Sequence, residues 1–408
     1  MNFEDSPQEA TYRAKARAWI AANKPDFSQL SSEERKQWHP AHKELVRRWQ
    51  ATKADAGYAC ISWPKEWGGA GGTTIEETIF NQEEARAGAQ FHYFATGLRM
   101  LLPALMEHNK DALSQSLVPP AVRGDTIWCQ LFSEPSSGSD SAGARCAAVR
   151  DGCDWVINGQ KVWNSGAQAS DYGMIVTRTN PDLPKHKGLT VFWLRMDTPG
   201  VEVRPIKMMS GDDEFNEVFL TDVRIPDSQR VGQIDGGWAV IISTLMNERA
   251  AVGSGTGLNW RDVVRLSAAI PGPDGRGLDD PAFRDWLADY YVNSEGIRLI
   301  SFRTLTSLSR GEAPGPESSA GKVLSANETQ DMTNRMIDLI DRYGLIDDPD
   351  LAPELGAFQH RFLWAPGLRL GGGSDEIMKN IIAERVLGLP GDVRVDKNVP
   401  FRDIPHGR

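Results

Sequence analysis

The 408-residue sequence predicts an α+β fold built from three consecutive domains, helical at both ends and all-β in the middle. Apolar residues recur at spacings of three and four over residues 1–125 and 236–408, which is the period of an amphipathic helix. Over residues 126–235 they alternate or run continuously between Gly, Pro, Asp and Asn, which is typical of short strands joined by turns. We place the domain limits where the period changes.

The first domain contains three segments with helical spacing, over residues 9–23, 32–57 and 74–89. Residues 62–72, "SWPKEWGGAGG", interrupt this pattern with a proline and a glycine cluster. The cluster contains a Gly-x-Gly, but no clear strand precedes it. A dinucleotide-binding fingerprint requires a strand, a glycine turn and a helix in that order, so the sequence disfavours one here.

The middle domain consists of short β-rich segments, and we expect a small barrel or sandwich. Two dipeptides within residues 144–166, Asp151-Gly152 and Asn158-Gly159, have the composition of hairpin turns. Further strands are predicted over residues 125–134, 171–179, 188–196, 200–206 and 216–226. The last domain returns to helical spacing over residues 236–258, 280–309, 318–344 and 374–389.

Composition excludes several functional classes. The net charge of −10 argues against a general nucleic-acid partner. No run of 18 or more apolar residues is present and the N-terminus lacks the apolar core of a signal peptide, so we expect a cytoplasmic protein without a membrane span. The four cysteines form no Cys-x-x-Cys and are expected to be reduced. His39 and His42 lack a completing ligand set, so no metal site is predicted.

Two segments of the middle domain are candidates for ligand contacts. In residues 131–143, "LFSEPSSGSDSAG", backbone amides and hydroxyls are free to face a ligand, and the alternative is a surface turn with local bonding. In residues 158–166, "NGQKVWNSG", strand alternation places Trp163 and Ser165 on one face. A flat ring and a hydroxyl two residues apart suit a planar heterocycle, and the alternative is a core tryptophan beside a buried serine.

These segments resemble the acyl-CoA dehydrogenase family. The resemblance rests on "SEPSSGSD" (133–140), "INGQKVWNSGA" (157–167) and "GGGSDEIMKNIIAERVLGLP" (371–390), and it extends to "ISWPKEWGGAGG" (61–72). It implies the family's fold, with a C-terminal four-helix bundle behind the helical and β domains. It also implies FAD as cofactor, oxidation of the α–β bond of an acyl-CoA thioester, and an electron-transfer flavoprotein as acceptor.

The resemblance also implies roles for individual residues. Ser139 stands where a serine contacts the pantetheine arm of the thioester, and Arg249 where an arginine helps to bind the acyl-CoA. Trp163 stands where an aromatic ring packs against the isoalloxazine, and Ser165 where a hydroxyl reaches flavin N5. The other positions implied to hold the cofactor are Gln130, Phe132 and Ser133 at the pyrimidine edge, with Ser374 and Glu376 beside the glycine run.

The catalytic base is missing from one of its two family positions. Many members carry a glutamate just before the C-terminal Gly-Thr/Ser pair, where this sequence has Gly372. Other members carry it on the helix that opens the C-terminal domain, and Glu248 matches that position. Independently, Ile241, Leu245, Glu248 and Val252 share one helical face, and a carboxylate in an apolar stripe should have a raised pKa, as a general base requires. The alternative for Glu248 is a salt bridge to another helix.

Two further expectations follow from departures from the family pattern. The missing side chain at Gly372 predicts a wider cavity for a bulky, branched or steroid side-chain acyl group. The family's Arg-x-x-Phe-Gly pattern is reduced to Arg276, and its Gln-x-x-Gly-Gly-x-Gly pattern to Gly344. An altered FAD adenine half-site is compatible with a heterotetramer as well as a homotetramer. The alternatives are a non-catalytic partner subunit and a family member with oxidase-type flavin chemistry.

Overall fold

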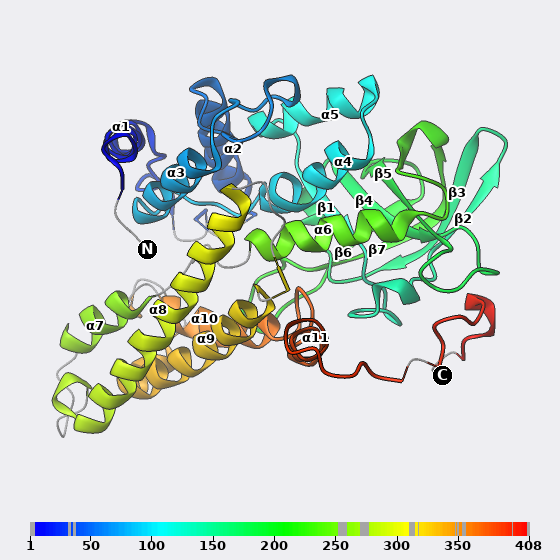
Figure 1. Cartoon of the computed structure of the whole chain (residues 1–408). Helices are drawn as coiled ribbons and strands as arrows, with labels where there is room; N and C mark the ends of the chain where they lie inside the picture. The colour runs from blue at the N-terminus through cyan, green and yellow to red at the C-terminus, as the bar shows by residue number, and fades with distance from the viewer. Residues whose placement is uncertain are drawn as a thin grey trace. The chain divides into compact units, whose positions relative to one another are not determined.

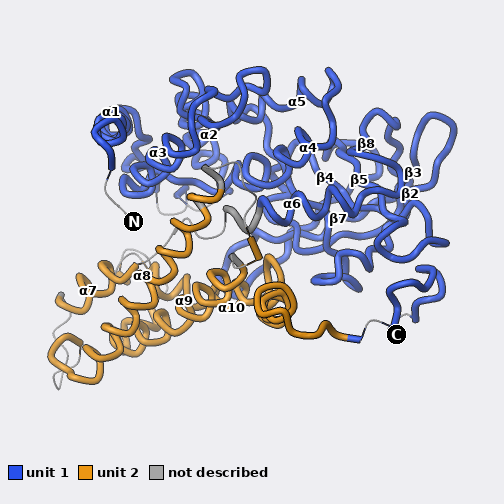
Figure 2. Tube along the Cα trace, viewed as in Figure 1, with its two compact units in different colours: residues 1–248, 393–408 blue, residues 249–392 orange. Residues whose placement is uncertain are grey.

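The computed structural model describes residues 5–31, 34–35, 38–251, 259–269, 277–309, 315–316, 318–346, 348, 351–352, 356–393 and 395–405. These residues form two compact units, shown in different colours in Figure 2. The first contains residues 1–248 and 393–408, and the second contains residues 249–392. Helices, then strands, then helices follow one another along the chain, as predicted (Figure 1).

The first unit begins with helices whose ends are marked by capping residues. Ser6 and Glu9 form a reciprocal capping box at the first helix, and Thr73 and Glu76 form another at the third. A pair of consecutive prolines, Pro119 and Pro120, lies inside the fifth helix. The helices are α1 (Pro7–Asn23), α2 (Pro40–Asp55), α3 (Thr74–Arg86), α4 (Leu102–His108) and α5 (Ala112–Arg123).

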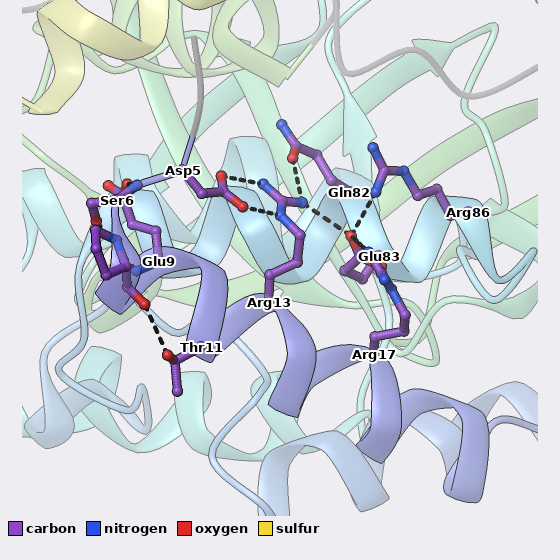
Figure 3. A network of polar contacts seen from close by, with 10 residues as sticks. Asp5, Ser6, Glu9, Thr11, Arg13, Arg17, Gln82, Glu83 and Arg86 are labelled. Carbon is purple, nitrogen blue, oxygen red and sulfur yellow. Dashed lines mark hydrogen bonds and ion pairs between the residues drawn. The ribbon is translucent and has the colours of Figure 1, made fainter. Parts of the chain in front are cut away.

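A buried carboxylate joins α1 to α3. Glu83, whose side chain is 2 % exposed, accepts hydrogen bonds from Arg13, Arg17 and Arg86 at 2.7–3.2 Å (Figure 3). Arg13 also pairs with Asp5, so one guanidinium ties the start of the chain to α3. Burial alone would raise the pKa of Glu83, but the hydrogen bonds from Arg17 and Arg13 outweigh it and hold that pKa below its usual range.

The middle part is an eight-stranded sheet with the order β6-β7-β3-β2-β4-β5-β8, and β1 pairs in parallel with β4. Most neighbours are antiparallel, including β2–β3, β3–β7, β4–β5 and β6–β7. The strands are β1 (Trp128–Leu131), β2 (Ala147–Asp151), β3 (Asp154–Lys161), β4 (Tyr172–Arg178), β5 (Leu189–Arg195), β6 (Val201–Pro205), β7 (Asn216–Pro226) and β8 (Arg230–Val231).

One of the two predicted hairpins is confirmed and the other is wrong. Gly152 lies in the turn between β2 and β3, as expected. Asn158 and Gly159 instead lie inside β3, where the register against β7 shifts in a β-bulge. Gly159 is required there because a Cβ would approach the Cα and Sγ of Cys146 to 2.8 Å. The same dipeptide suits a turn and a bulge. Here β3 pairs with β7 on both sides of it, so it forms a bulge.

The sheet is buried on both faces at β4 and β5, which explains the continuous apolar runs of these two strands. Met174 and Val176 of β4 belong to one core cluster, which includes residues of α4, α5 and α6 (Gly237–Ala251). Ile175 of β4 and Phe192 of β5 belong to the cluster on the other face. All four cysteines are unpaired thiols, and burial raises the pKa of Cys129 to about 12.

The second unit is helical. Its core contains Val263, Tyr290, Met332, Met336 and Phe358, which come from four different helices. The helices are α7 (Trp260–Ala269), α8 (Pro281–Ser309), α9 (Ser318–Ile340), α10 (Ala357–Leu368) and α11 (Asp375–Ile381). Among the described residues, none of the helices combines the length and the hydropathy that a bilayer span would need.

Candidate functional site

The two segments singled out in the middle domain lie side by side in the structure. The amide of Val162 donates to the carbonyl oxygen of Ser133 at 3.0 Å. The side-chain amide of Asn164 donates to the carbonyl oxygen of Gln130 at 2.8 Å. The end of β1 is therefore held against the turn that follows β3. This contact brings together the predicted residues Gln130 and Ser133 on one segment and Trp163 and Ser165 on the other.

Trp163 has an unusual conformation for a large aromatic residue. Its φ is +61°, in the left-handed region, and its side chain is 57 % exposed. The edge of its ring meets Phe215 at a centroid separation of 5.8 Å. The prediction that strand alternation orients Trp163 and Ser165 is wrong, because β3 ends at Lys161 and both residues lie beyond it, Trp163 in irregular backbone and Ser165 in the turn that follows. Residues held in such strained conformations cluster at functional sites.

The Trp163 turn is fixed by buried polar contacts on its inner side. Asn164 is 1 % exposed, and its amide donates to the carbonyl oxygen of Asn216 at 3.1 Å. Asn216 returns a hydrogen bond from its side chain to the carbonyl oxygen of Asn164 at 2.9 Å. Gly166 has φ of +68°, and a Cβ there would lie 2.4 Å from the ring of Trp38. The backbone that carries the exposed ring is thus rigidly supported from behind.

The groups beside the Trp163 ring are suited to a flat, polar ligand such as the isoalloxazine of a flavin. Within the described part of the chain, the hydroxyls of Ser133 and Ser165 make no hydrogen bond. Phe132 is 5 % exposed, so its side chain belongs to the core and only its backbone is available. An exposed ring, two unpaired hydroxyls and a fixed backbone together fit the face and edge of a tricyclic ring system.

The serine-rich loop, residues 133–143, is closed by its own backbone. Glu134 and Ser137 exchange two backbone hydrogen bonds at 2.8 and 3.0 Å, and the hydroxyl of Ser137 donates to the carbonyl oxygen of Asp140. Gly138 and Ser139 are exposed at the tip. The local bonding expected of a surface turn is therefore present, and it leaves Ser139 accessible to a ligand.

Two residues that the sequence analysis missed hold this loop to the sheet. Lys161 is fully buried, and its Nζ lies 2.7 Å from Oε1 of Glu134 and 3.1 Å from the carbonyl oxygen of Phe132. Glu134, 5 % exposed, also accepts the amides of Arg145 at 2.7 Å and Cys146 at 2.9 Å. The sequence signal for this pair was a lysine at an inward-facing position of the strand "NGQK", which demands a buried partner.

The glycine run in the second unit is held by polar contacts of its own. Gly372 and Gly373 have φ of +67° and +91°. Nζ of Lys322 donates to the carbonyl oxygen of Gly373 at 2.6 Å. Ser374 caps α11 by accepting the amide of Ile377, so its hydroxyl serves the helix itself. Glu376 is exposed, and hydrogen bonds from its own amide and from Ser374 hold its pKa below the usual range.

The predicted base lies on α6. Ile241 is fully buried and Leu245 packs against the core of the first unit, so the described half of the predicted apolar face is present. The backbone of α6 continues through Glu248 and Arg249. The side chains of both residues, and the whole of Val252, lie outside the described residues, as does Arg276. Gly344 lies in the short 3₁₀ segment Asp341–Leu345.

The first candidates for a metal site have other roles. His39 caps α2 by accepting the amide of Ala41, and Nδ1 of His42 lies 2.9 Å from the hydroxyl of Tyr93. Across the ranges that the structure describes, His, Cys, Asp and Glu side chains form no group of three that could hold a metal ion.

Three family models match consecutive parts of the chain. They are described as the N-terminal domain of acyl-CoA dehydrogenase, over residues 6–125, its middle domain, over 129–223, and its C-terminal domain, over 235–387. The chain belongs to the acyl-CoA dehydrogenase family. It therefore has the three-domain architecture of these enzymes and is an oxidoreductase of a FAD-dependent family.

Relatives of this acyl-CoA dehydrogenase include proteins from Mycobacterium tuberculosis. IpdE1 is 34 % identical over 392 residues, which cover 94 % of this chain and 98 % of IpdE1. FadE34 is 35 % identical over 341 residues, which cover 84 % of this chain. The aligned part is only 46 % of FadE34, so the chain spans about half the length of that relative.

Solved structures of two-component family members have a similar fold. The Tcur3481-Tcur3483 steroid acyl-CoA dehydrogenase superposes with a TM-score of 0.82 at 27 % identity, covering 96 % of this chain and all of that one. The ChsE4-ChsE5 complex from Mycobacterium tuberculosis gives 0.81 at 28 % identity with the same coverage. The fold class predicted from the sequence is thus confirmed.

Proposed function

We propose that this acyl-CoA dehydrogenase oxidises the α–β bond of an acyl-CoA thioester to the trans-2-enoyl-CoA. The substrate loses a proton from the α-carbon and a hydride from the β-carbon, and a new C=C bond forms. FAD, when bound, would supply the hydride acceptor. The proposal rests chiefly on the Trp163 turn, where a strained backbone presents a ring beside unpaired hydroxyls.

The residues of this turn have separate roles in the proposal. The Trp163 ring would pack against the isoalloxazine, and the Ser165 hydroxyl would donate to N5. Gln130, the backbone of Phe132, and Ser133 would hold the pyrimidine edge. Ser374 and Glu376 are also proposed to contact the cofactor. Holding the ring in one orientation places its reactive edge towards the substrate, which is the protein's main contribution to flavin chemistry.

The carboxylate of Glu248 is the proposed base that takes up the α-proton. The alternative position is disfavoured by its backbone, since Gly372 has φ of +67° and a glutamate there would be strained. Glu248 is on the helix whose preceding turns pack Ile241 and Leu245 into the core, so its position continues an apolar face. A base in apolar surroundings has a raised pKa, which favours proton transfer near neutral pH. Arg249 is proposed to bind the acyl-CoA.

We propose a bulky, branched or steroid side-chain acyl group as the substrate class. Gly372 carries no side chain where many family members have their base, which leaves space in the acyl cavity. One of the similar solved structures is a steroid acyl-CoA dehydrogenase, which supports this class. Anaerobic titration of the purified yellow protein with short, long, branched and steroid acyl-CoAs tests it. Bleaching of the flavin by bulky acyl-CoAs is expected, and bleaching by straight chains only contradicts the substrate class.

A heterotetramer is favoured over a homotetramer by two observations. The family's FAD adenine motifs are reduced in this sequence, and two similar solved structures carry paired names, Tcur3481-Tcur3483 and ChsE4-ChsE5. A partner subunit would then complete each FAD site. If this chain is instead a non-catalytic partner subunit, the chain purified alone should bind little FAD and gain activity only with a second, catalytic subunit.

The proposed electron acceptor is an electron-transfer flavoprotein. The oxidase alternative predicts that the reduced flavin reacts rapidly with oxygen. Mixing the substrate-reduced protein with air-saturated buffer separates the two, because a dehydrogenase should be reoxidised slowly by oxygen and rapidly by an electron-transfer flavoprotein.

A further inference from the structure

A segment near the C-terminus, residues 395–405, is bound to the middle domain and is called the strap here. The amide of Phe401 donates to the carbonyl oxygen of Leu183 at 2.9 Å, and that of Arg402 to Pro181 at 3.0 Å. Pro400 forms a β-bridge with Pro184. In the sequence the strap follows the second unit, yet by its contacts it belongs to the first.

The strap places one aromatic ring against two cations. Phe401 is 5 % exposed, and the guanidinium of Arg178 lies 3.7 Å from the centre of its ring. The guanidinium of Arg145 lies 4.8 Å from the same centre. Cations over an aromatic face are attracted by its quadrupole, most strongly where water is excluded.

Arg178 and Arg145 also belong to the neighbourhood of the serine-rich loop. Arg178 donates to the carbonyl oxygens of Ala142 at 2.6 Å and Ala144 at 3.2 Å. Arg145 lies two residues after the loop, and its backbone amide donates to Glu134, the second residue of the loop. The ring of Phe401 therefore packs on the Arg178 side chain, which holds the end of the loop, and on the side chain of Arg145, whose backbone amide bonds to Glu134.

A second contact joins the strap to the loop near its tip. Nζ of Lys185 lies 2.9 Å from Oδ2 of Asp140 and 2.7 Å from Oδ2 of Asp396. Asp140 is the neighbour of Ser139, and Asp396 belongs to the strap. The Lys185 side chain is only 15 % exposed, so this bridge is partly shielded from solvent. The strap thus reaches both the end of the loop and its tip.

We propose that the strap is a positioning element that holds the serine-rich loop in the geometry that binds the pantetheine arm. This inference rests on the proposed function, because Ser139 is assigned to that arm there. Phe401 and Asp396 are positioning residues, which act on the ligand through Arg145, Arg178 and Lys185. Loosening the strap should weaken binding of the CoA portion and leave the chemical step and the flavin unaffected.

The test compares Phe401→Ala with Phe401→Tyr and with Val395→Ala in the full-length FAD-loaded protein. Val395 lies in the same segment but is 85 % exposed, so it controls for substitution in the strap as such. Isothermal titration with coenzyme A, which carries the pantetheine arm without an acyl group, gives the Kd. Hydrogen exchange of the amides of residues 133–146 reports the loop directly and requires no ligand.

For Phe401→Ala we expect a Kd for coenzyme A raised about 3- to 30-fold, as two cation–π contacts are lost. We also expect a raised KM with unchanged kcat, faster exchange in the loop and an unchanged flavin spectrum. Phe401→Tyr should keep the Kd, the KM and the loop exchange at their wild-type values, and Val395→Ala should match the wild type. Asp396→Asn should raise the Kd less than Phe401→Ala does, because Lys185 keeps its ion pair with Asp140.

Failure of the strap and failure of the proposed function are distinguishable. If the wild type binds coenzyme A and Phe401→Ala binds it equally tightly, the strap proposal is overturned whatever the loop exchange shows. The same conclusion follows if kcat falls and KM stays unchanged. If the wild type binds no coenzyme A, the proposed function is contradicted, and the strap's role in binding is contradicted with it.

Discussion

The buried pair of Lys161 and Glu134 gives the most quantitative prediction for the candidate site. Replacing Lys161 by methionine leaves the Glu134 carboxylate, 5 % exposed, without its ammonium partner. Breaking a buried pair in this way typically costs roughly 3–5 kcal/mol. Two amide hydrogen bonds to Glu134 remain, from Arg145 and Cys146, so the lower limit of about 3 kcal/mol is expected.

The assay is thermal unfolding followed by circular dichroism and, in parallel, by release of FAD fluorescence. At about 2–4 °C per kcal/mol for a domain of this size, Lys161→Met should lower the Tm by roughly 6–12 °C. The double variant Lys161→Met with Glu134→Gln removes both charges and should recover at least half of the loss. Lys207→Met, an exposed lysine in the same domain, is the control.

The reasoning is refuted if Lys161→Met loses less than about 1 kcal/mol, the value expected of an exposed pair. It is also refuted if the double variant is less stable than the single one. Either result would mean that the buried charge of Glu134 does not require Lys161, and that the loop is anchored in another way.

Three further predictions concern other parts of the first unit. Glu83→Gln should destabilise the protein at pH 7, as measured by urea unfolding. Because the native pKa of Glu83 is lowered, the difference in unfolding free energy between variant and wild type should shrink as the pH falls below about 4. Gly159→Ala should cost about 1–3 kcal/mol in the same assay, since its Cβ would approach Cys146 to 2.8 Å, and an unchanged midpoint would disprove the bulge. Trp163→Ala should weaken FAD binding about tenfold or more with little loss of stability, because its ring is exposed, whereas equal FAD affinity would remove it from the site.

Periodicity predicted the helical and β regions well because it reflects burial, which local sequence encodes directly. It did not distinguish a hairpin from a bulge at Asn158-Gly159, since both need a residue that tolerates special backbone angles. The left-handed backbone of Trp163 was beyond sequence reasoning, because contacts of Asn164 with distant Gln130 and Asn216 impose it.

The sequence identified the candidate ligand-contacting residues but not the buried contacts that hold their loop in place. The sequence motifs singled out Ser133, Trp163 and Ser165, and the structure brings their two segments into contact. Lys161 and Glu134 are 27 positions apart, and their pairing depends on how the loop folds back on β3. The Phe401 contact was missed for the same reason, as tertiary packing brings the strap to Arg145 and Arg178.

The assignment of Glu248 as the base is tested most directly by rapid anaerobic mixing of FAD-loaded Glu248→Gln with the acyl-CoA that bleaches the wild type fastest. Glu107→Gln, an exposed glutamate of the first unit, is the matched control. We expect the control to bleach at the wild-type rate. In Glu248→Gln we expect acyl-CoA binding to persist while the rate of bleaching falls by about 10²-fold or more, as for loss of a general base. Bleaching of that variant at the wild-type rate would contradict the mechanism.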